Sequence, residues 1–122
     1  MAQFDIVEKS GAKIAVVNDK ATVITDEQSA VDFMSEVLEK TGCDRVIVDK
    51  CIVPKEFFDL STGLAGSILQ KFVNYRMKIA FVGNFSIYQS KSLRDFIYES
   101  NKGKDVFFVD SEEQALEKLS SI

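Results

Sequence analysis

The chain has 122 residues, of which 46% are hydrophobic and 28% are charged, and its formal net charge is −4. This length and composition predict one ordered domain over residues 1–122 and argue against a disordered or two-domain protein. Because proteins neutralise the phosphates of nucleic acids and anionic lipids with Lys and Arg, the acidic balance argues against both partners. The chain has no histidine, which excludes nucleophile–base arrangements built on that residue.

The cysteines and the N-terminus indicate the compartment. Cys43 and Cys51 are too few for a disulfide framework, and their spacing is not that of a zinc site or a thioredoxin-type pair. The first residues show no basic stretch followed by an apolar run, and no apolar run reaches membrane-spanning length. We therefore expect a cytoplasmic protein with reduced cysteines that uses no metal, no cofactor and no membrane.

The N-terminal third is predicted to contain strands followed by a helix. Three short extended runs are expected, at residues 4–7, 13–17 and 21–24. Gly11 can adopt the positive φ that a tight hairpin between the first two requires. Thr25 is expected to cap the first helix, with Gln28 completing a capping box, and Gly42 to end it.

The remaining chain alternates between two patterns. Three short all-apolar runs predict strands that are buried on both faces and pair in parallel, at residues 46–48, 79–82 and 106–109. Apolar residues at helical spacing follow each run, and Ser111 with Gln114 forms a second capping box before the last helix. The predicted fold is α/β, a mixed sheet with antiparallel N-terminal strands, parallel C-terminal strands and about four helices.

Polar residues follow the three buried strands. They are Asp49 and Lys50 after the first, Asn84 after the second and Asp110 after the third. Because ligands and partners of open α/β sheets meet the carboxyl ends of the strands, these residues are expected to form one rim. Asp49 with Asp110 could serve as a metal or acid–base pair, but Asp49 is more readily explained as ordering its loop and Asp110 as a helix cap.

A helix begins within the segment 59–66, D-L-S-T-G-L-A-G, at the same rim. Ser61 or Thr62 is suited to cap this helix, while Gly63 and Gly66 leave its first turn bare. Free N–H groups and the helix dipole attract an anion there, either as a ligand or as phosphate carried on Thr62 or Ser61. The alternative is that Thr62 only caps and the glycines let the helix pack closely on the sheet.

Four stretches resemble the STAS domain, the fold of sulfate transporters and anti-sigma-factor antagonists. They are Val46-Ile-Val-Asp49, Asp59-Leu-Ser-Thr-Gly-Leu-Ala-Gly66, Val82-Gly-Asn84 and Phe108-Val-Asp-Ser-Glu-Glu-Gln-Ala-Leu116. The whole chain is also similar to bacterial domain-of-unknown-function family 4180. It shares that family's stretches F-F-D-L-S-T-G-L-A-G-x-I-L-Q-K-F and S-K-S-L-x-D-F-I-Y-E. The first resemblance implies a STAS-like sheet, and the second implies no activity.

The STAS resemblance also implies a mechanism. In antagonist-type members, a partner kinase phosphorylates a serine or threonine at the second hydroxyl position of this motif and so switches partner binding. Here that position is Thr62, with Ser61 before it, and Asp49 and Asn84 match positions that flank the same surface. The implied partner is therefore a kinase or an anti-sigma-like regulator.

The chain departs from the STAS pattern in this region. Additional residues, Val53-Pro54-Lys55-Glu56, lie between the strand and the motif, and Leu60 separates Asp59 from Ser61. These differences change how the hydroxyl groups are presented at the rim.

The leading hypothesis is a regulatory module that binds a protein partner through a rim of Asp49, Lys50, Asp59, Gly63, Asn84 and Asp110. The alternative is a protein that binds a small anion, a phosphate or a nucleotide, at the helix start near Thr62. An enzyme is less expected, and no residue is assigned a catalytic role. The sequence is also compatible with a homodimer formed through a sheet edge or a helix face.

Overall fold

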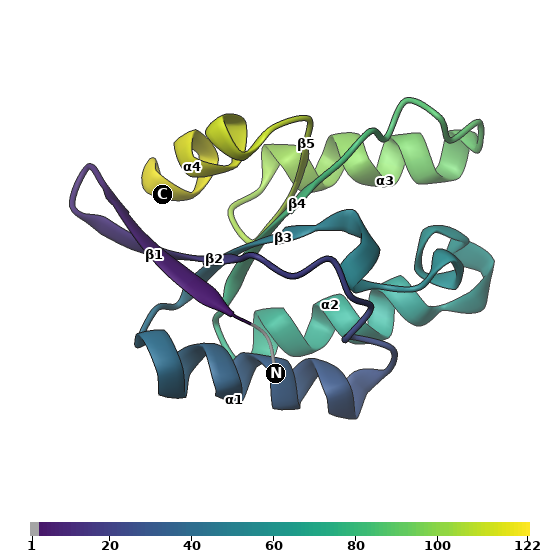
Figure 1. Cartoon of the computed structure of the whole chain (residues 1–122). Coiled ribbons are helices and arrows are strands. Elements are labelled where there is room, and N and C mark those ends of the chain that lie inside the picture. Colours follow the sequence, from purple (N-terminus) through teal and green to yellow (C-terminus); the bar gives the residue numbers. More distant parts are fainter. Residues whose placement is uncertain (1–2) are drawn as a thin grey trace.

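The computed structural model describes residues 3–122, and a five-stranded sheet lies at its centre (Figure 1). The strands lie in sequence order and are β1 Phe4–Lys9, β2 Ala12–Val17, β3 Arg45–Asp49, β4 Lys78–Val82 and β5 Val106–Val109. β1 pairs with β2 antiparallel, and each later strand is parallel to its predecessor. This arrangement confirms the predicted mixed sheet.

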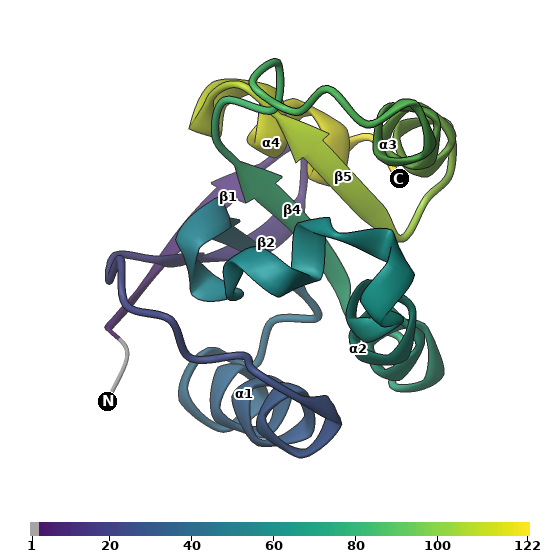
Figure 2. The ribbon, with the colours of Figure 1, turned by 90° about the vertical axis from the view of Figure 1, so that its right-hand side faces the viewer.

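Within these residues the helices are α1 Glu27–Thr41, α2 Leu64–Asn74, α3 Lys91–Lys102 and α4 Glu112–Ser120. Right-handed crossovers between neighbouring parallel strands place the connecting helices on the same face of a sheet. Accordingly, α1, α2 and α3 lie on one face of the sheet, where α3 packs against β5. Helix α4 covers the opposite face (Figure 2). None of the helices described is long and apolar enough to cross a membrane.

Helices on both sides explain why the parallel strands are apolar on both faces. All four residues of β5 are buried, and they alternate between the two halves of the core. On one face Phe108 stacks on Phe81 with ring centroids 5.0 Å apart, and on the other Phe107 packs with Leu119 of α4. Of the residues described, no polar or charged one is buried, so apolar burial supplies the core.

Residues 21–24 do not form the third N-terminal strand that the sequence predicted. The N–H groups of Val23 and Ile24 both donate to the carbonyl of Ile52, at 3.0 and 2.9 Å. Both sides of β2 are already paired, with β1 and β3, so this segment has no free neighbour there. Its apolar pattern reflects burial of Ile24 beneath the loop after β3, where it is 0% exposed.

The cap of α1 lies one residue later than predicted. Asp26, not Thr25, is the N-cap, and its carboxylate accepts from the N–H of Ser29 while the Ser29 hydroxyl accepts from the N–H of Asp26. The helix thus begins with a reciprocal capping box, but it is formed by Asp26 and Ser29 and not by Thr25 and Gln28 as predicted. Gly42 ends the helix at φ 69°, as expected.

The cap of α4 is confirmed at Ser111, whose hydroxyl accepts from the N–H of Gln114 at 3.2 Å. The Gln114 side chain, however, accepts from the N–H of Asp110, at 2.9 Å, and so completes the turn one residue earlier than a capping box requires. The expectation that Asp110 itself caps α4 is wrong. At the other end of the chain, Gly11 has the positive φ, 81°, that the β1–β2 hairpin requires.

The outer edge of β5 is closed by a side chain. Asn101 of α3 accepts from the N–H of Phe108 at 2.8 Å and donates to the carbonyl of the same residue at 3.0 Å. One amide side chain thus satisfies both backbone groups, as a neighbouring strand would. An edge strand with free groups is a template for pairing with another chain, and this contact removes the template at the middle of β5.

We expect Asn101→Ala to lower the free energy of unfolding by about 1–3 kcal/mol, because it leaves the N–H and the carbonyl of Phe108 without their partners. Chemical denaturation monitored by circular dichroism measures this change. Asn74→Ala, at the end of α2, is the matched control and should cost less. Equal losses for the two variants would contradict the role assigned to Asn101.

Candidate functional site

The carboxyl ends of β3, β4 and β5 meet at one edge of the sheet, as predicted. Lys50, directly after β3, donates from Nζ to the backbone carbonyl of Asn84 beyond β4, at 3.2 Å. Asn84 in turn lines a cavity of about 300 Å³ with Gly83, Ser86 and Asp110. The structure therefore brings Lys50, Asn84 and Asp110 together along the rim.

The Lys50 side chain depends on Gly83. A Cβ atom at position 83 would lie 2.6 Å from Cδ of Lys50, so only glycine leaves room for the lysine stem. Beyond this point the ammonium group lies 5.1 Å from the ring centroid of Tyr88 and 5.9 Å from that of Phe85. A bond to the Asn84 carbonyl and two aromatic rings therefore fix the position of the Lys50 charge at the rim.

Asp49 faces its own loop. Its carboxylate accepts from the N–H of Cys51 at 2.9 Å, as expected of a residue that orders the turn after a strand. Burial acts to raise the pKa of Asp49, but hydrogen bonds from Cys51 and the charges of Lys20 and Lys50 outweigh it and lower the pKa. Asp49 does not line the cavity that contains Asp110, so the two carboxylates are not joined as a pair.

Cys51 is held as a thiol. Its Sγ donates to the carbonyl of Lys20 at 3.0 Å, and burial, together with the hydrogen bond and charge of Asp49, raises its pKa to about 11. Since the thiolate is the nucleophile and metal ligand, Cys51 is suited to neither role at neutral pH. In residues 3–122, no three Cys, Asp or Glu side chains gather closely enough to hold a metal ion.

The start of α2 differs from the prediction. Ser61 and Thr62 lie in a short 3-10 helix, Leu60–Thr62, and the N-cap of α2 is Gly63, at φ 75°. A left-handed residue at this junction lets the chain turn from one helix into the other, which glycine does without strain. Neither hydroxyl residue is therefore the N-cap.

Both hydroxyl groups instead make local bonds. Asp59 accepts from the N–H and the hydroxyl of Ser61, at 3.1 and 2.6 Å, and these bonds lower its pKa. The Thr62 hydroxyl lies 3.0 Å from the carbonyl of Glu56 and 2.9 Å from that of Asp59, and donates toward them. It also accepts from the N–H of Leu64, at 3.2 Å, so it satisfies one donor of the first turn.

Gly66 does not serve close packing. A Cβ atom there would meet no atom within 4 Å, and the residue is exposed. Helix α2 packs on the sheet through other residues, Ala65, Ile68, Leu69 and Phe72. The alternative that both glycines let α2 approach the sheet is thus wrong: Gly63 supplies a backbone conformation, and Gly66 leaves the outer surface bare.

A groove that the sequence did not predict lies beside the rim. It has a volume of about 480 Å³ and is lined by Thr22, Lys50, Cys51, Val53, Pro54, Lys55, Phe58, Ile87 and Tyr88, which we call the rim groove. Phe58 and Tyr88 stack with ring centroids 5.1 Å apart and join its two sides. The sequence feature that could have indicated this groove is the presence of apolar residues in the loops after β3 and β4.

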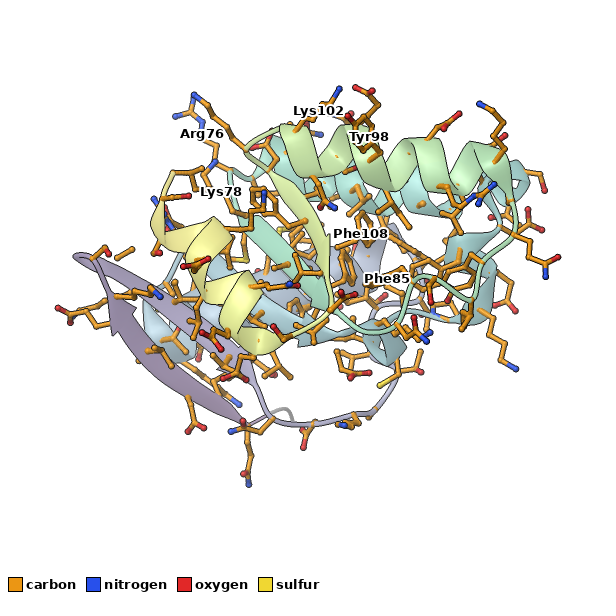
Figure 3. The ribbon with its side chains drawn as sticks, turned by 90° about the horizontal axis from the view of Figure 1, so that it is seen from above. Arg76, Lys78, Phe85, Tyr98, Lys102 and Phe108 are labelled. Atoms are coloured by element: carbon orange, nitrogen blue, oxygen red, sulfur yellow. The ribbon has the colours of Figure 1, made fainter. Side chains whose placement is uncertain are left out.

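Phe57 and Phe58 both belong to the core, at 1% and 8% exposed, rather than to an open patch. Deeper aromatic contacts support them. The ring centroids of Phe58 and Phe85 are 5.9 Å apart, and the ring of Phe85 meets that of Phe108 edge-on, with centroids 5.4 Å apart (Figure 3). The groove wall is therefore continuous with the packing of β5.

The rim and the helix start are two neighbouring parts, linked by the segment 55–62. Thr62, Ser61 and Gly63 do not line the rim groove or the cavity at Asp110. Phe58, however, lies in the groove wall, and in the chain it stands between Glu56 and Asp59. The carbonyls of these two residues accept hydrogen bonds from the Thr62 hydroxyl. The Thr62 bonds thus hold the backbone on both sides of a groove residue.

A protein-family model described as a domain of unknown function (DUF4180) matches residues 9–119. The chain belongs to this family. The match includes the hairpin from Lys9 onward, the parallel strands, the rim and the start of α2. No curated protein and no solved structure matches the chain.

Substitution by alanine should have opposite effects on stability at the two glycines near the start of α2. Gly63→Ala should destabilise the protein by about 1–2 kcal/mol, because it forces a Cβ into the left-handed region. Gly66→Ala should stabilise it by up to about 1 kcal/mol, since the site is helical and open. Thermal or urea unfolding measures both, and a stabilising Gly63→Ala would contradict the assigned conformation.

Proposed function

We propose that this protein is a STAS-like, cytoplasmic regulatory module that binds a protein partner at the rim groove, and that phosphorylation of Thr62 switches the binding. The observation that carries the proposal is the hydroxyl of Thr62, which holds the two carbonyls that flank Phe58 of the groove wall. The DUF4180 assignment leaves the activity open, so the proposal rests on this geometry and on the STAS resemblance.

The sheet supports the STAS-like part of the proposal. The antiparallel β1–β2 pair precedes strands joined in sequence order, which agrees with the arrangement that the resemblance implies. Asp49 and Asn84 lie at the ends of neighbouring strands, where the resemblance places residues that flank the partner surface. The shared order of motifs therefore has a counterpart in space.

The chemistry of the rim groove supports a protein partner with an acidic and apolar segment. Its walls are mainly apolar, and Ile87 at its margin is 57% exposed. An exposed aliphatic side chain beside a concave apolar surface is a feature of protein-binding sites. Lys50 and Lys55 add positive charge to the same walls in a chain of net charge −4, which favours acidic side chains on the partner.

Phosphorylation would act through the bonds of Thr62. A phosphoryl group on Oγ1 removes the hydrogen donated toward Glu56 and Asp59 and adds about −1.5 to −2 charge beside two carbonyls. The backbone around Phe58 would lose its tie and the groove wall would move. At Ser61, a phosphoryl group would face the carboxylate of Asp59, whose Oδ1 now lies 2.6 Å from the hydroxyl. Both residues are exposed, as a kinase substrate must be.

A second candidate is a module that binds phosphate or a nucleotide at the start of α2. Its support is that the first turn carries no acidic residue and that Gly63 and Gly66 leave open space there. The carboxylate of Asp59, close to the same turn, weakens the attraction for an anion. Thermal stabilisation by inorganic phosphate that Gly63→Ala abolishes would favour this candidate.

The proposal is tested by affinity capture from bacterial lysate with the wild type, Thr62→Glu and Thr62→Ser, followed by mass spectrometry. We expect a partner that is captured by the wild type or by Thr62→Glu but not by both. Thr62→Ser keeps the hydroxyl and should behave as the wild type.

Ile87→Ser should lose that partner, whereas Ile6→Ser, at a similarly exposed position on β1, should keep it. Equal capture by the wild type, Thr62→Glu and Ile87→Ser would contradict both the groove and the switch.

A further inference from the structure

β1 forms an open edge of the sheet. It is a regular strand of six residues without proline, and β2 is its only strand neighbour in residues 3–122. Figure 3 shows β1 at the margin of the molecule, with no ribbon of the described chain outside it. The opposite edge, β5, carries the Asn101 contact to Phe108. The molecule thus closes one edge of its sheet and leaves the other open.

The outward-facing backbone groups of β1 follow from its pairing with β2. The N–H of Asn18 donates to the carbonyl of Gln3 at 3.0 Å, so Gln3 faces β2. Because backbone groups alternate between the two sides of an antiparallel strand, those of Phe4, Ile6 and Glu8 face away from β2. Three consecutive outward positions therefore offer donors and acceptors to a further strand.

We propose that two copies of this chain pair through β1, antiparallel, about a twofold axis perpendicular to the sheet at Ile6. Such an axis keeps equivalent faces of the two sheets on the same side, so side chains that project from the same face become opposite. Ile6 then lies opposite Ile6 of the partner subunit, and Phe4 opposite Glu8 of the partner subunit. The two sheets become one continuous sheet, which removes the open edge of both copies.

The side chains of β1 favour this antiparallel pairing. Ile6 is 51% exposed in the single chain, and in the pair it gains an apolar cross-strand neighbour. On the other face Asp5 lies opposite Val7 of the partner subunit, so it is diagonal both to Lys9 of the partner subunit and to Asp5 of the partner subunit. The pair therefore has two attractive Asp5–Lys9 diagonals and one repulsive Asp5–Asp5 diagonal. An in-register parallel arrangement would instead place the two Asp5 carboxylates together and the two Glu8 carboxylates together. On balance the charges of β1 thus favour antiparallel over in-register parallel pairing with its own copy.

Analytical ultracentrifugation over micromolar to millimolar concentrations tests the proposal. The wild type should sediment at high concentration with twice the chain mass of 13.7 kDa. Ile6→Pro should raise the dissociation constant at least about tenfold, because it removes a donor at the twofold axis. The N–H of Ile6 faces outward, so this substitution breaks no bond within the sheet and the monomer should fold.

Ile6→Lys provides a second variant that keeps the backbone donor. It places two ammonium groups opposite each other and should also leave the protein monomeric. Ile87→Lys, at a similarly exposed position at the rim groove, is the control and should dimerise as the wild type does.

A charge swap tests the direction of pairing. Asp5→Lys and Lys9→Asp should each weaken the dimer, and the double variant should restore it. A wild type that stays at 13.7 kDa throughout overturns the proposal. So does a dimer that neither Ile6 variant weakens, or a double variant no stronger than its single variants. These results do not depend on the rim groove or on Thr62.

Discussion

The sequential order of the parallel strands β2 to β5 is the constraint on which the other features depend. Because each of these strands runs in the same direction, all of their carboxyl ends meet at one edge, and the loops that follow β2 to β5 begin there. The rim residues, the rim groove and the segment before α2 all belong to these loops. The same linear order leaves two outer strands, β1 and β5, whose free edges must be closed in some other way.

At the rim, small residues and hydroxyl groups fix the positions of larger side chains. Gly83 gives space to the stem of Lys50, whose ammonium group then lies against Tyr88 in the groove. The Thr62 hydroxyl likewise holds the backbone around Phe58, the residue that stacks on Tyr88 from the other side. A change at Thr62 would therefore reach the groove through a few bonds, without rearrangement of the sheet. This short route is what the proposed switch at Thr62 requires.

Periodicity in the sequence predicted the regular elements, because burial on one or two faces leaves a direct signal in the apolar pattern. The runs at 79–82 and 106–109 are strands buried on both faces, and Gly11 and Gly42 adopt the predicted positive φ. The run at 21–24 was wrongly predicted to be a strand, since burial of Ile24 under a loop produces the same apolar pattern as a strand.

The loops could not be predicted in the same way. Three short 3-10 helices occupy much of residues 50–62, and their hydrogen bonds to side chains follow no period. The rim groove combines residues from three loops, so it exists only once the sheet has placed them together. Asn101 illustrates the same limit at β5: in the sequence it is one more polar residue of an amphipathic helix, and only the structure gives it a function.

Amide hydrogen exchange across residues 55–63 tests the central claim most directly, namely that the Thr62 hydroxyl controls the groove wall. The N–H groups of Phe57, Asp59 and Thr62 donate to the carbonyls of Pro54, Glu56 and Asp59, respectively, and report on the order of this segment. The account predicts faster exchange of these groups in Thr62→Glu than in the wild type and Thr62→Ser, with β3 and β4 unchanged. Unchanged exchange in residues 55–63 of Thr62→Glu would contradict it, because the groove wall would then be independent of Thr62.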